Sequence, residues 1–246
     1  MVDSTLVFIA AVFALAGLVK GVIGLGLPTI SMGLLATVMS PISAAAILLL
    51  PSFVTNVWQM VAGPSLGVVI RRLWPMMLAV CLGTWAGLGL MTGASARFGT
   101  TLLGVSLVAY AVSGLVALRA PAPGTSERIL STVIGAVTGL ITAATGVFVI
   151  PVVPWLQAIG LEKEVLVQAL GLSFTVSTLA LAVNIGAEGG LQVAMASDTI
   201  VALVFACGGM WLGQHIRLRL SPAMFRRCFF SGLLLLGLYL IARSVA

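Results

Sequence analysis

Residues 16–35 read AGLVKGVIGLGLPTISMGLL, and this stretch decides how the beginning of the chain folds. It lies inside an apolar run, residues 4–39, that would be about 54 Å long as one helix, whereas the hydrocarbon core of a bilayer is about 30 Å thick. Glycine costs about 1 kcal/mol and proline about 3 kcal/mol in a helix interior. The helix is therefore expected to break between Gly21 and Pro28, giving two short helices that meet at a broken tip.

The rest of the chain is equally apolar. Of its 246 residues, 61% are hydrophobic and 7% are charged, whereas soluble domains carry roughly 25% charged residues. Continuous apolar runs long enough to cross a bilayer as helices exclude a membrane β-barrel, whose strands alternate in polarity. The sequence predicts one all-α polytopic membrane domain, residues 1–246, without an aqueous catalytic head.

The chain is predicted to contain two copies of one unit. The pattern CxGxWxG occurs at residues 81–87 and again at residues 207–213. Weaker matches pair Gly17 and Gly21 with Gly135 and Gly139, and Ser52 with Ser173. The repeats are residues 4–118 and 129–245, joined by the polar linker 119–128. Such duplication is typical of secondary transporters.

The second repeat opens as the first does. Its apolar run, residues 129–159, is interrupted around Thr142, Thr145 and Gly146 and again at Pro151. We therefore expect a second broken-helix hairpin at this place. The glycine pairs of each CxGxWxG pattern are spaced as small-residue helix-packing faces. Trp85 and Trp211 are expected to fill space inside the bundle, and the cysteines to behave as small buried hydrophobes.

The basic residues distinguish two membrane topologies. If each opening run crosses once, giving eight crossings as 4+4, they divide five against six between the two faces. If each run enters and returns, nine share one face and only Arg97 and Arg243 lie opposite, which is the bias expected of a cytoplasmic face. The nine are Arg71, Arg72, Arg119, Arg128, Lys163, Arg217, Arg219, Arg226 and Arg227. This favours two inverted repeats of about five helical segments with periplasmic termini; eight crossings are the alternative.

The broken tips predict the position of a substrate site. In inverted repeats with discontinuous helices, the site lies near the bilayer midplane, where helix ends expose backbone groups. A glycine-rich tip before a helix start presents N–H groups to an anion. The residues offered by the two tips are Gly24, Gly26, Thr29 and Ser31, and Thr142, Thr145 and Gly146. The same residues could equally serve close helix packing.

Lys20 is the one cation inside an apolar run. It is expected at the cytoplasmic mouth, where it would attract an anion; the alternative is a lysine that snorkels to water. Asn56 and Gln59 lie one turn apart in the next apolar segment, and Ser173 and Thr175 lie in the matching segment of the second repeat. These side chains either hydrogen-bond an oxyanion or tie helices together.

Several kinds of chemistry are not supported. Cys81, Cys207 and Cys228 lack metal-ligand spacing, and the only histidine is His215, so no metal site, disulfide framework or cofactor is predicted. The net charge of +6 is spread between the apolar segments rather than clustered for nucleic-acid binding. An enzyme would need a convergent nucleophile, base or metal cluster, and the sequence offers none.

The quoted opening, together with residues 135–164 and the stretch QALGLSFTVS at 168–177, resembles the TauE/SafE sulfite exporter family of bacterial membrane transporters. The resemblance covers almost the whole chain. It implies a secondary transporter that exports sulfite or a small organosulfonate across the bacterial inner membrane, coupled to an ion gradient. The chain departs from the family pattern at Leu25, Leu27, Ser31 and Ala143-Ala144.

The alternatives to this function are an anion channel and a transporter of another small organic anion. The partners implied are the lipid bilayer and a small anionic substrate, and the sequence leaves open whether the chain forms a homo-oligomer.

Overall fold

The structure is a computed structural model that describes residues 4–92, 96–116, 124–193, 196–217 and 222–245. These residues form ten α-helices and no strand. Two of the helices are short, α2 (Leu27–Leu35) and α7 (Val152–Ala158). The other eight are long and apolar enough to cross a membrane: α1 (Ser4–Ile23), α3 (Pro41–Val61), α4 (Leu66–Ala86), α5 (Ala96–Leu115), α6 (Glu127–Thr145), α8 (Lys163–Ala187), α9 (Ala196–Ile216) and α10 (Pro222–Val245). The predicted all-α polytopic class is confirmed.

Both predicted helix breaks are present. The chain leaves α1 through Gly24 and Gly26, whose φ angles are 78° and 110°, and it leaves α6 through Gly146, whose φ is 69°. Glycine adopts these left-handed conformations without the steric penalty of a Cβ. The prediction of two short helices at each break is wrong, however, because α1 has 20 residues and α6 has 19, so only the second helix of each hairpin is short.

The first helix stays intact because its inner glycines pack against another helix. A Cβ on Gly17 would collide with the backbone carbonyl of Ala206 in α9, and one on Gly209 would collide with that of Ala14 in α1. In a bilayer, helices associate through such close backbone approaches rather than through hydrophobic burial. Packing at the glycines thus compensates for their low helix propensity.

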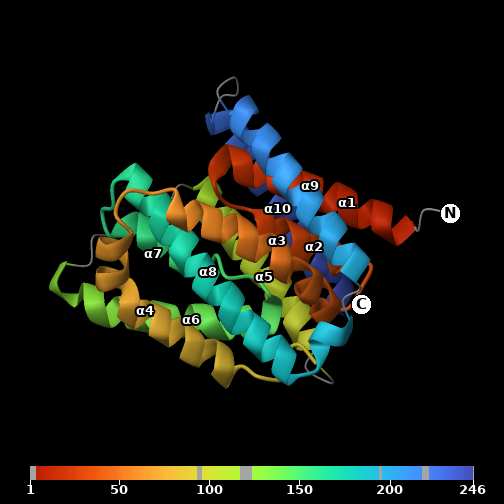
Figure 1. Ribbon diagram of the computed structural model, residues 1–246. Coiled ribbons are helices and arrows are strands. Elements are labelled where there is room, and N and C mark those ends of the chain that lie inside the picture. The colour runs from red at the N-terminus through yellow and green to blue at the C-terminus, as the bar shows by residue number, and fades with distance from the viewer. Residues whose placement is uncertain (1–3, 93–95, 117–123, 194–195, 218–221, 246) are drawn as a thin grey trace.

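The same contact recurs between α4 and α6. A Cβ on Gly135 would collide with the carbonyl of Met76, and one on Gly83 with that of Ala136. The first helix of each half therefore lies along the fourth helix of the other half (Figure 1). In both pairs the facing residue numbers rise together, so the paired helices run parallel. The glycines predicted to form packing faces do so.

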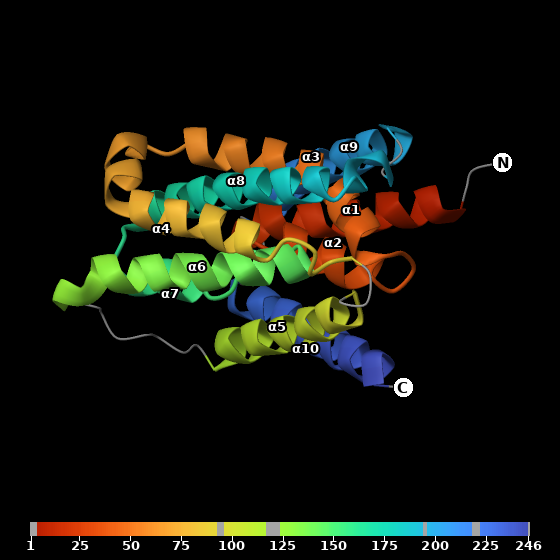
Figure 2. The same cartoon turned by 90° about the horizontal axis from the view of Figure 1, so that it is seen from below.

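The third and fifth helices pair across the halves in the opposite sense. α3 crosses α8 in the antiparallel sense. Ser52 lies beside Thr178, and the Met60 carbonyl accepts a hydrogen bond from the Gln168 amide. α5 likewise crosses α10, and Figure 2 shows this pair as a separate layer below the others. A two-fold axis perpendicular to the helices would produce this arrangement. It would make equivalent helices antiparallel, as in α3–α8 and α5–α10, and it would relate the parallel pair α1–α9 to the parallel pair α4–α6. The inverted orientation of the repeats in a membrane stays a prediction.

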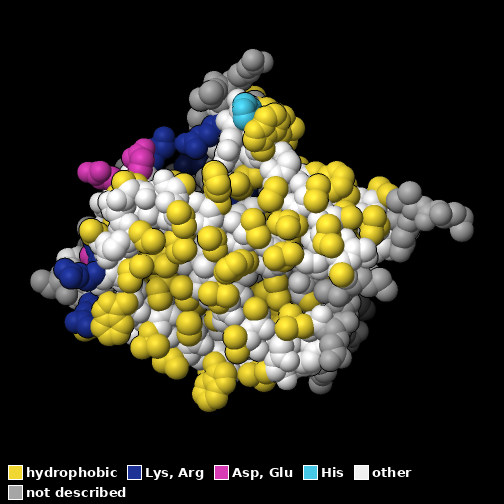
Figure 3. Space-filling model, viewed as in Figure 1, with side chains coloured by type: hydrophobic (Ala, Val, Ile, Leu, Met, Phe, Trp, Pro, Cys, Tyr) yellow, Lys and Arg dark blue, Asp and Glu magenta, His cyan; other side chains and the backbone are white. Residues whose placement is uncertain are grey.

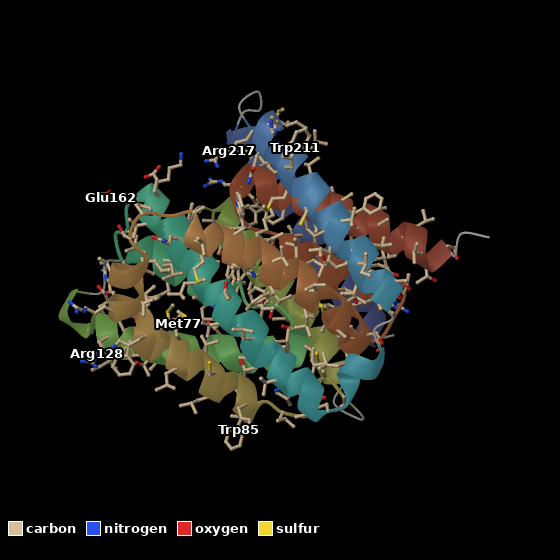
Figure 4. The ribbon with its side chains drawn as sticks, in the orientation of Figure 1. Met77, Trp85, Arg128, Glu162, Trp211 and Arg217 are labelled. Carbon is tan, nitrogen blue, oxygen red and sulfur yellow. The ribbon has the colours of Figure 1, made fainter. Side chains whose placement is uncertain are left out.

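The two chain ends lie at one end of the bundle together with Arg243, and most of the described basic side chains gather at the other end (Figures 1 and 3). Figure 4 places Arg128, Glu162 and Arg217 at this basic end. Here the Arg72 guanidinium of α4 donates two hydrogen bonds, of 2.6 Å and 2.8 Å, to the Glu127 carboxylate of α6. Of the nine residues predicted to share a face, Arg119 and Arg219 lie outside the described residues, as do residues 119–123 of the predicted linker 119–128.

The bundle surface is apolar, and both tryptophans of the repeated pattern belong to it. Trp85 is 69% exposed and Trp211 is 62% exposed, and both point away from the helices in Figure 4. The prediction that they fill the interior is wrong because each lies two residues after a glycine that faces the partner helix, which turns it to the other side of its own helix. Cys81 and Cys228 are also exposed rather than buried.

Candidate functional site

Lys20 lies inside the protein. It belongs to the last turn of α1, and only 4% of it is exposed. Its ammonium donates a hydrogen bond of 3.0 Å to Thr55 Oγ1 and a second bond to Asn56 Oδ1, both in α3. The expected position at a wet cytoplasmic mouth and the alternative of a snorkelling lysine are therefore both wrong. The reason is that α3 presents two acceptors to the side chain before it can reach either face.

Asn56 is held in one orientation by a chain of hydrogen bonds. Its Nδ2 donates to Ser52 Oγ at 3.0 Å, and Ser52 Oγ lies 3.2 Å from Thr178 Oγ1 in α8. Thr178 in turn donates to the carbonyl of Phe174 at 2.7 Å, so its own proton is committed. The chain runs from Lys20 through α3 into α8 and fixes Asn56 Oδ1 toward the ammonium.

This polar network lies near the middle of the bundle. Ser52 is at the centre of the 21-residue α3, and Thr178 is in the second half of α8. All five side chains, Lys20, Ser52, Thr55, Asn56 and Thr178, are at least nine-tenths buried. The observed network thus coincides with the crossing of α3 and α8, where the two halves meet.

No carboxylate balances the Lys20 charge. Among the described residues, no aspartate or glutamate is buried, and the one ion pair is Arg72 with Glu127 at the basic end. Moving an ion from water into a protein interior costs several kcal/mol unless a counter-charge is present. A buried ammonium with two neutral acceptors is consequently a site that favours an anion.

The first tip lies close to this network. Gly24 follows the last residue of α1, and its backbone N–H donates to the Lys20 carbonyl at 2.7 Å. The side chain nearest to its Cβ position is the Gln59 amide of α3. Gln59 donates through Nε2 to the Val167 carbonyl at 3.1 Å, so its Oε1 remains an acceptor. The structure therefore brings together four predicted site residues, Lys20, Gly24, Asn56 and Gln59.

The second tip does not join them through any hydrogen bond among the described residues. Thr142 and Thr145 donate to carbonyls of their own helix, those of Thr138 and Ile141, and Thr175 does the same to Gly171. A Cβ on Gly146 would collide with the side chain of Met32 in α2. The second tip thus reaches α2, the short helix that follows Gly26. Hydroxyls that bond back to carbonyls of their own helix fit a packing role.

Three buried serine hydroxyls have no hydrogen-bond partner among the described residues. They are Ser31 in α2 and Ser173 and Ser177 in α8, and each is fully buried. The Thr29 hydroxyl, by contrast, donates a hydrogen bond of 2.9 Å to the Gly26 carbonyl. A buried unpaired hydroxyl costs about 1–3 kcal/mol. Of the predicted site residues, Ser31 and Ser173 therefore keep the strongest claim to a ligand after Lys20.

Sequence reasoning missed Thr55, which is one of the two hydrogen-bond acceptors of Lys20. The available signal was the spacing of Ser52, Thr55 and Asn56, which places three polar side chains within one turn of an apolar helix. Gln168 was missed as well. It ties the end of α3 by donating to the carbonyls of Met60 and Gly63.

A groove of about 400 Å³ opens between α4 and α8. Cys81 and Trp85 line one side, and Val176, Leu179 and Val183 line the other. The wall is almost wholly apolar, because the one amide there, that of Asn184, is committed to the Thr84 carbonyl at 2.7 Å. The groove opens on the apolar outer surface of the bundle and does not have the chemistry of an anion site.

Comparison with known proteins adds one match. No curated protein and no solved structure matches the chain. The family described as "Sulfite exporter TauE/SafE" matches residues 9–240, nearly the whole chain, including α1, α3 and the hydrogen-bonded network between α3 and α8. With eight membrane-length helices and this match, the chain belongs to the sulfite exporter TauE/SafE family of membrane transporters.

Proposed function

We propose that the protein is a secondary transporter that carries a small sulfur oxyanion, sulfite or an organosulfonate, out across the bacterial inner membrane. One observation carries the proposal: the Lys20 side chain is buried with only neutral hydrogen-bond partners at the crossing of α3 and α8. An oxyanion beside it would accept a hydrogen bond from the ammonium and would supply the missing counter-charge. The family to which the chain belongs supports the substrate class.

The bound anion is placed against Lys20, with Gly24 and Gln59 on one flank. Ser173 and Ser31 supply further hydroxyl donors, because their oxygens have no other partner among the described residues. Neutral donors of this kind satisfy several oxygens without adding a second charge to the membrane interior, where charges are costly. Asn56 acts by holding the ammonium in place, since both ends of its amide are already used.

Binding to purified protein tests this proposal. We expect sulfite or sulfoacetate to raise the thermal unfolding midpoint, because a ligand that binds only the folded state stabilises it in proportion to its concentration over Kd. Sulfate, acetate and taurine form the comparison set. Stabilisation by acetate with none by either sulfur compound would replace the sulfur oxyanion with another organic anion.

A channel is the second candidate, because broken helices also occur in channels. The buried hydrogen-bonded network argues for a carrier, since an open pore would hydrate Lys20. Liposome flux separates the two. A carrier shows counterflow, in which unlabelled substrate trapped inside drives uptake of labelled substrate, whereas a channel shows none.

The proposed orientation places both termini in the periplasm and the basic end in the cytoplasm, in keeping with the positive-inside rule. In a variant without Cys81, Cys207 and Cys228, we expect a membrane-impermeant maleimide added to whole cells to label Ser4→Cys but not Ser126→Cys. Both positions are exposed. Labelling of Ser126→Cys in intact cells would reverse the orientation.

A further inference from the structure

The Lys20 side chain has two hydrogen-bond acceptors. Thr55 Oγ1 and Asn56 Oδ1 each accept one N–H, and no other acceptor of this side chain is present among the described residues. Thr55 can only accept from Lys20, because its own hydroxyl proton goes to the Pro51 carbonyl at 2.7 Å. Asn56 Nδ2 is turned away toward Ser52, so the amide also offers Lys20 only its oxygen.

A neutral amine has two N–H bonds, and a charged ammonium has three. The two acceptors satisfy a neutral amine completely. They leave one N–H of an ammonium unpaired in a site with no counter-charge, and this arrangement is unfavourable in a medium of low dielectric constant. An oxyanion beside Lys20 supplies both things that the ammonium lacks, a third acceptor and an opposite charge.

The neighbouring helices provide no other group that could take over this role. α2 and α3 carry no titratable residue. In α9, Cys207 lies near the middle of the helix, while Asp198 and His215 lie in the first and last turns. In α10, the described titratable side chains are Arg226, Arg227, Cys228, Tyr239 and Arg243, all of them exposed or near a helix end. Cys207 is neutral as a thiol and offers no counter-charge.

We propose that Lys20 carries the coupling proton, so that the anion and one proton bind together and leave together. In the empty site, Lys20 is the neutral amine held by Thr55 and Asn56. Binding then follows R–NH2 + H⁺ + A⁻ → R–NH3⁺···A⁻, in which the amine lone pair takes the proton and no other bond changes. The inference rests on the proposed function and names the residue and the ion through which transport is coupled.

Calorimetry on the intact purified protein tests the proton count. The probe is sulfoacetate, whose sulfonate and carboxylate groups both stay ionised between about pH 7 and 9, so it contributes no protons of its own. Sulfite is unsuitable here because it titrates near neutral pH. Titrations in two buffers with different ionisation enthalpies give the number of protons taken up. We expect about one proton per sulfoacetate bound, and a Kd that rises roughly tenfold per unit of increasing pH because the required proton becomes scarcer.

Two variants control the measurement. Lys20→Arg stays charged at every accessible pH, so whatever sulfoacetate it binds is bound with no proton uptake and with a Kd that does not vary with pH. Lys163→Arg changes an exposed residue at the basic end and should keep the wild-type proton count. If the arginine variant does not fold, the pH dependence of the wild-type Kd decides alone.

The outcomes separate this inference from the function on which it rests. Wild-type protein that binds sulfoacetate with no proton uptake and a constant Kd overturns the role of Lys20 and leaves the transporter intact. Wild-type protein that binds neither sulfoacetate nor sulfite overturns both. Proton uptake that persists in Lys20→Arg assigns the proton to another residue and also overturns the inference.

Discussion

Lys20→Gln weakens anion binding by the same large factor at low and at high ionic strength. The side chain is buried and bonded inside the bundle, so mobile ions do not screen its interaction with a bound anion. Removing one partner of a buried charge pair costs about 2–5 kcal/mol, which is roughly a 30-fold to 4,000-fold loss of affinity. The affinity for sulfite, measured from the thermal shift at two salt concentrations, checks this prediction.

Lys163→Gln is the matched control for that variant. Lys163 is exposed at the start of α8, at the basic end of the bundle. An exposed charge at this position attracts an anion only over long range, and salt screens this attraction. We expect no loss at high ionic strength. A Lys20→Gln defect that disappears at high salt would instead place Lys20 at a wet mouth, contrary to its burial.

Gly209→Ala lowers the stability of the bundle sharply, whereas Gly208→Ala does not. A Cβ on Gly209 would press on the backbone of Ala14 and Leu18 in α1, and backbone atoms cannot rotate away. Overpacking of this kind costs about 1–3 kcal/mol. Gly208 is the preceding residue of the same helix and has nothing near its Cβ position, so alanine there only improves helix propensity.

Thermal unfolding in detergent compares these two variants, with size-exclusion chromatography to check that each remains monodisperse. We expect the midpoint of Gly209→Ala to fall by several degrees while that of Gly208→Ala stays level or rises. Equal midpoints would mean that α1 and α9 can move apart without a loss of stability. The close glycine packing would then not be what holds these two helices together.

The sequence predicted the glycine contacts because their cause is local. A small residue at every fourth position leaves a flat face, and Gly83, Gly87, Gly209 and Gly213 form such faces whatever the rest of the chain does. The two helix breaks were predictable for the same reason. The sequence could not show which faces meet. That α1 packs on α9 and α4 on α6, each across the two halves, is visible only in the folded bundle.

The place of Lys20 depends on the tertiary structure. From the sequence, its long stem could carry the charge to water as easily as inward. The choice is made by Thr55 and Asn56, which lie 35 and 36 residues away and reach the ammonium only when α3 packs beside α1. Trp85 illustrates the same limit, because its exposure follows from which side of α4 faces α6.

Because helices of one half pack against helices of the other half, these contacts can form only in a certain order during biosynthesis. α1 is made first, but its partner α9 emerges near the end of translation, and α4 must likewise wait for α6. During this interval the glycine faces of α1 and α4 lie against lipid, where a face without side chains leaves a poorly filled surface. The first half therefore persists in the membrane as inserted but unassembled helices. Synthesis that stops between the halves leaves both faces open, which makes the truncated chain a natural target for proteolysis in the membrane.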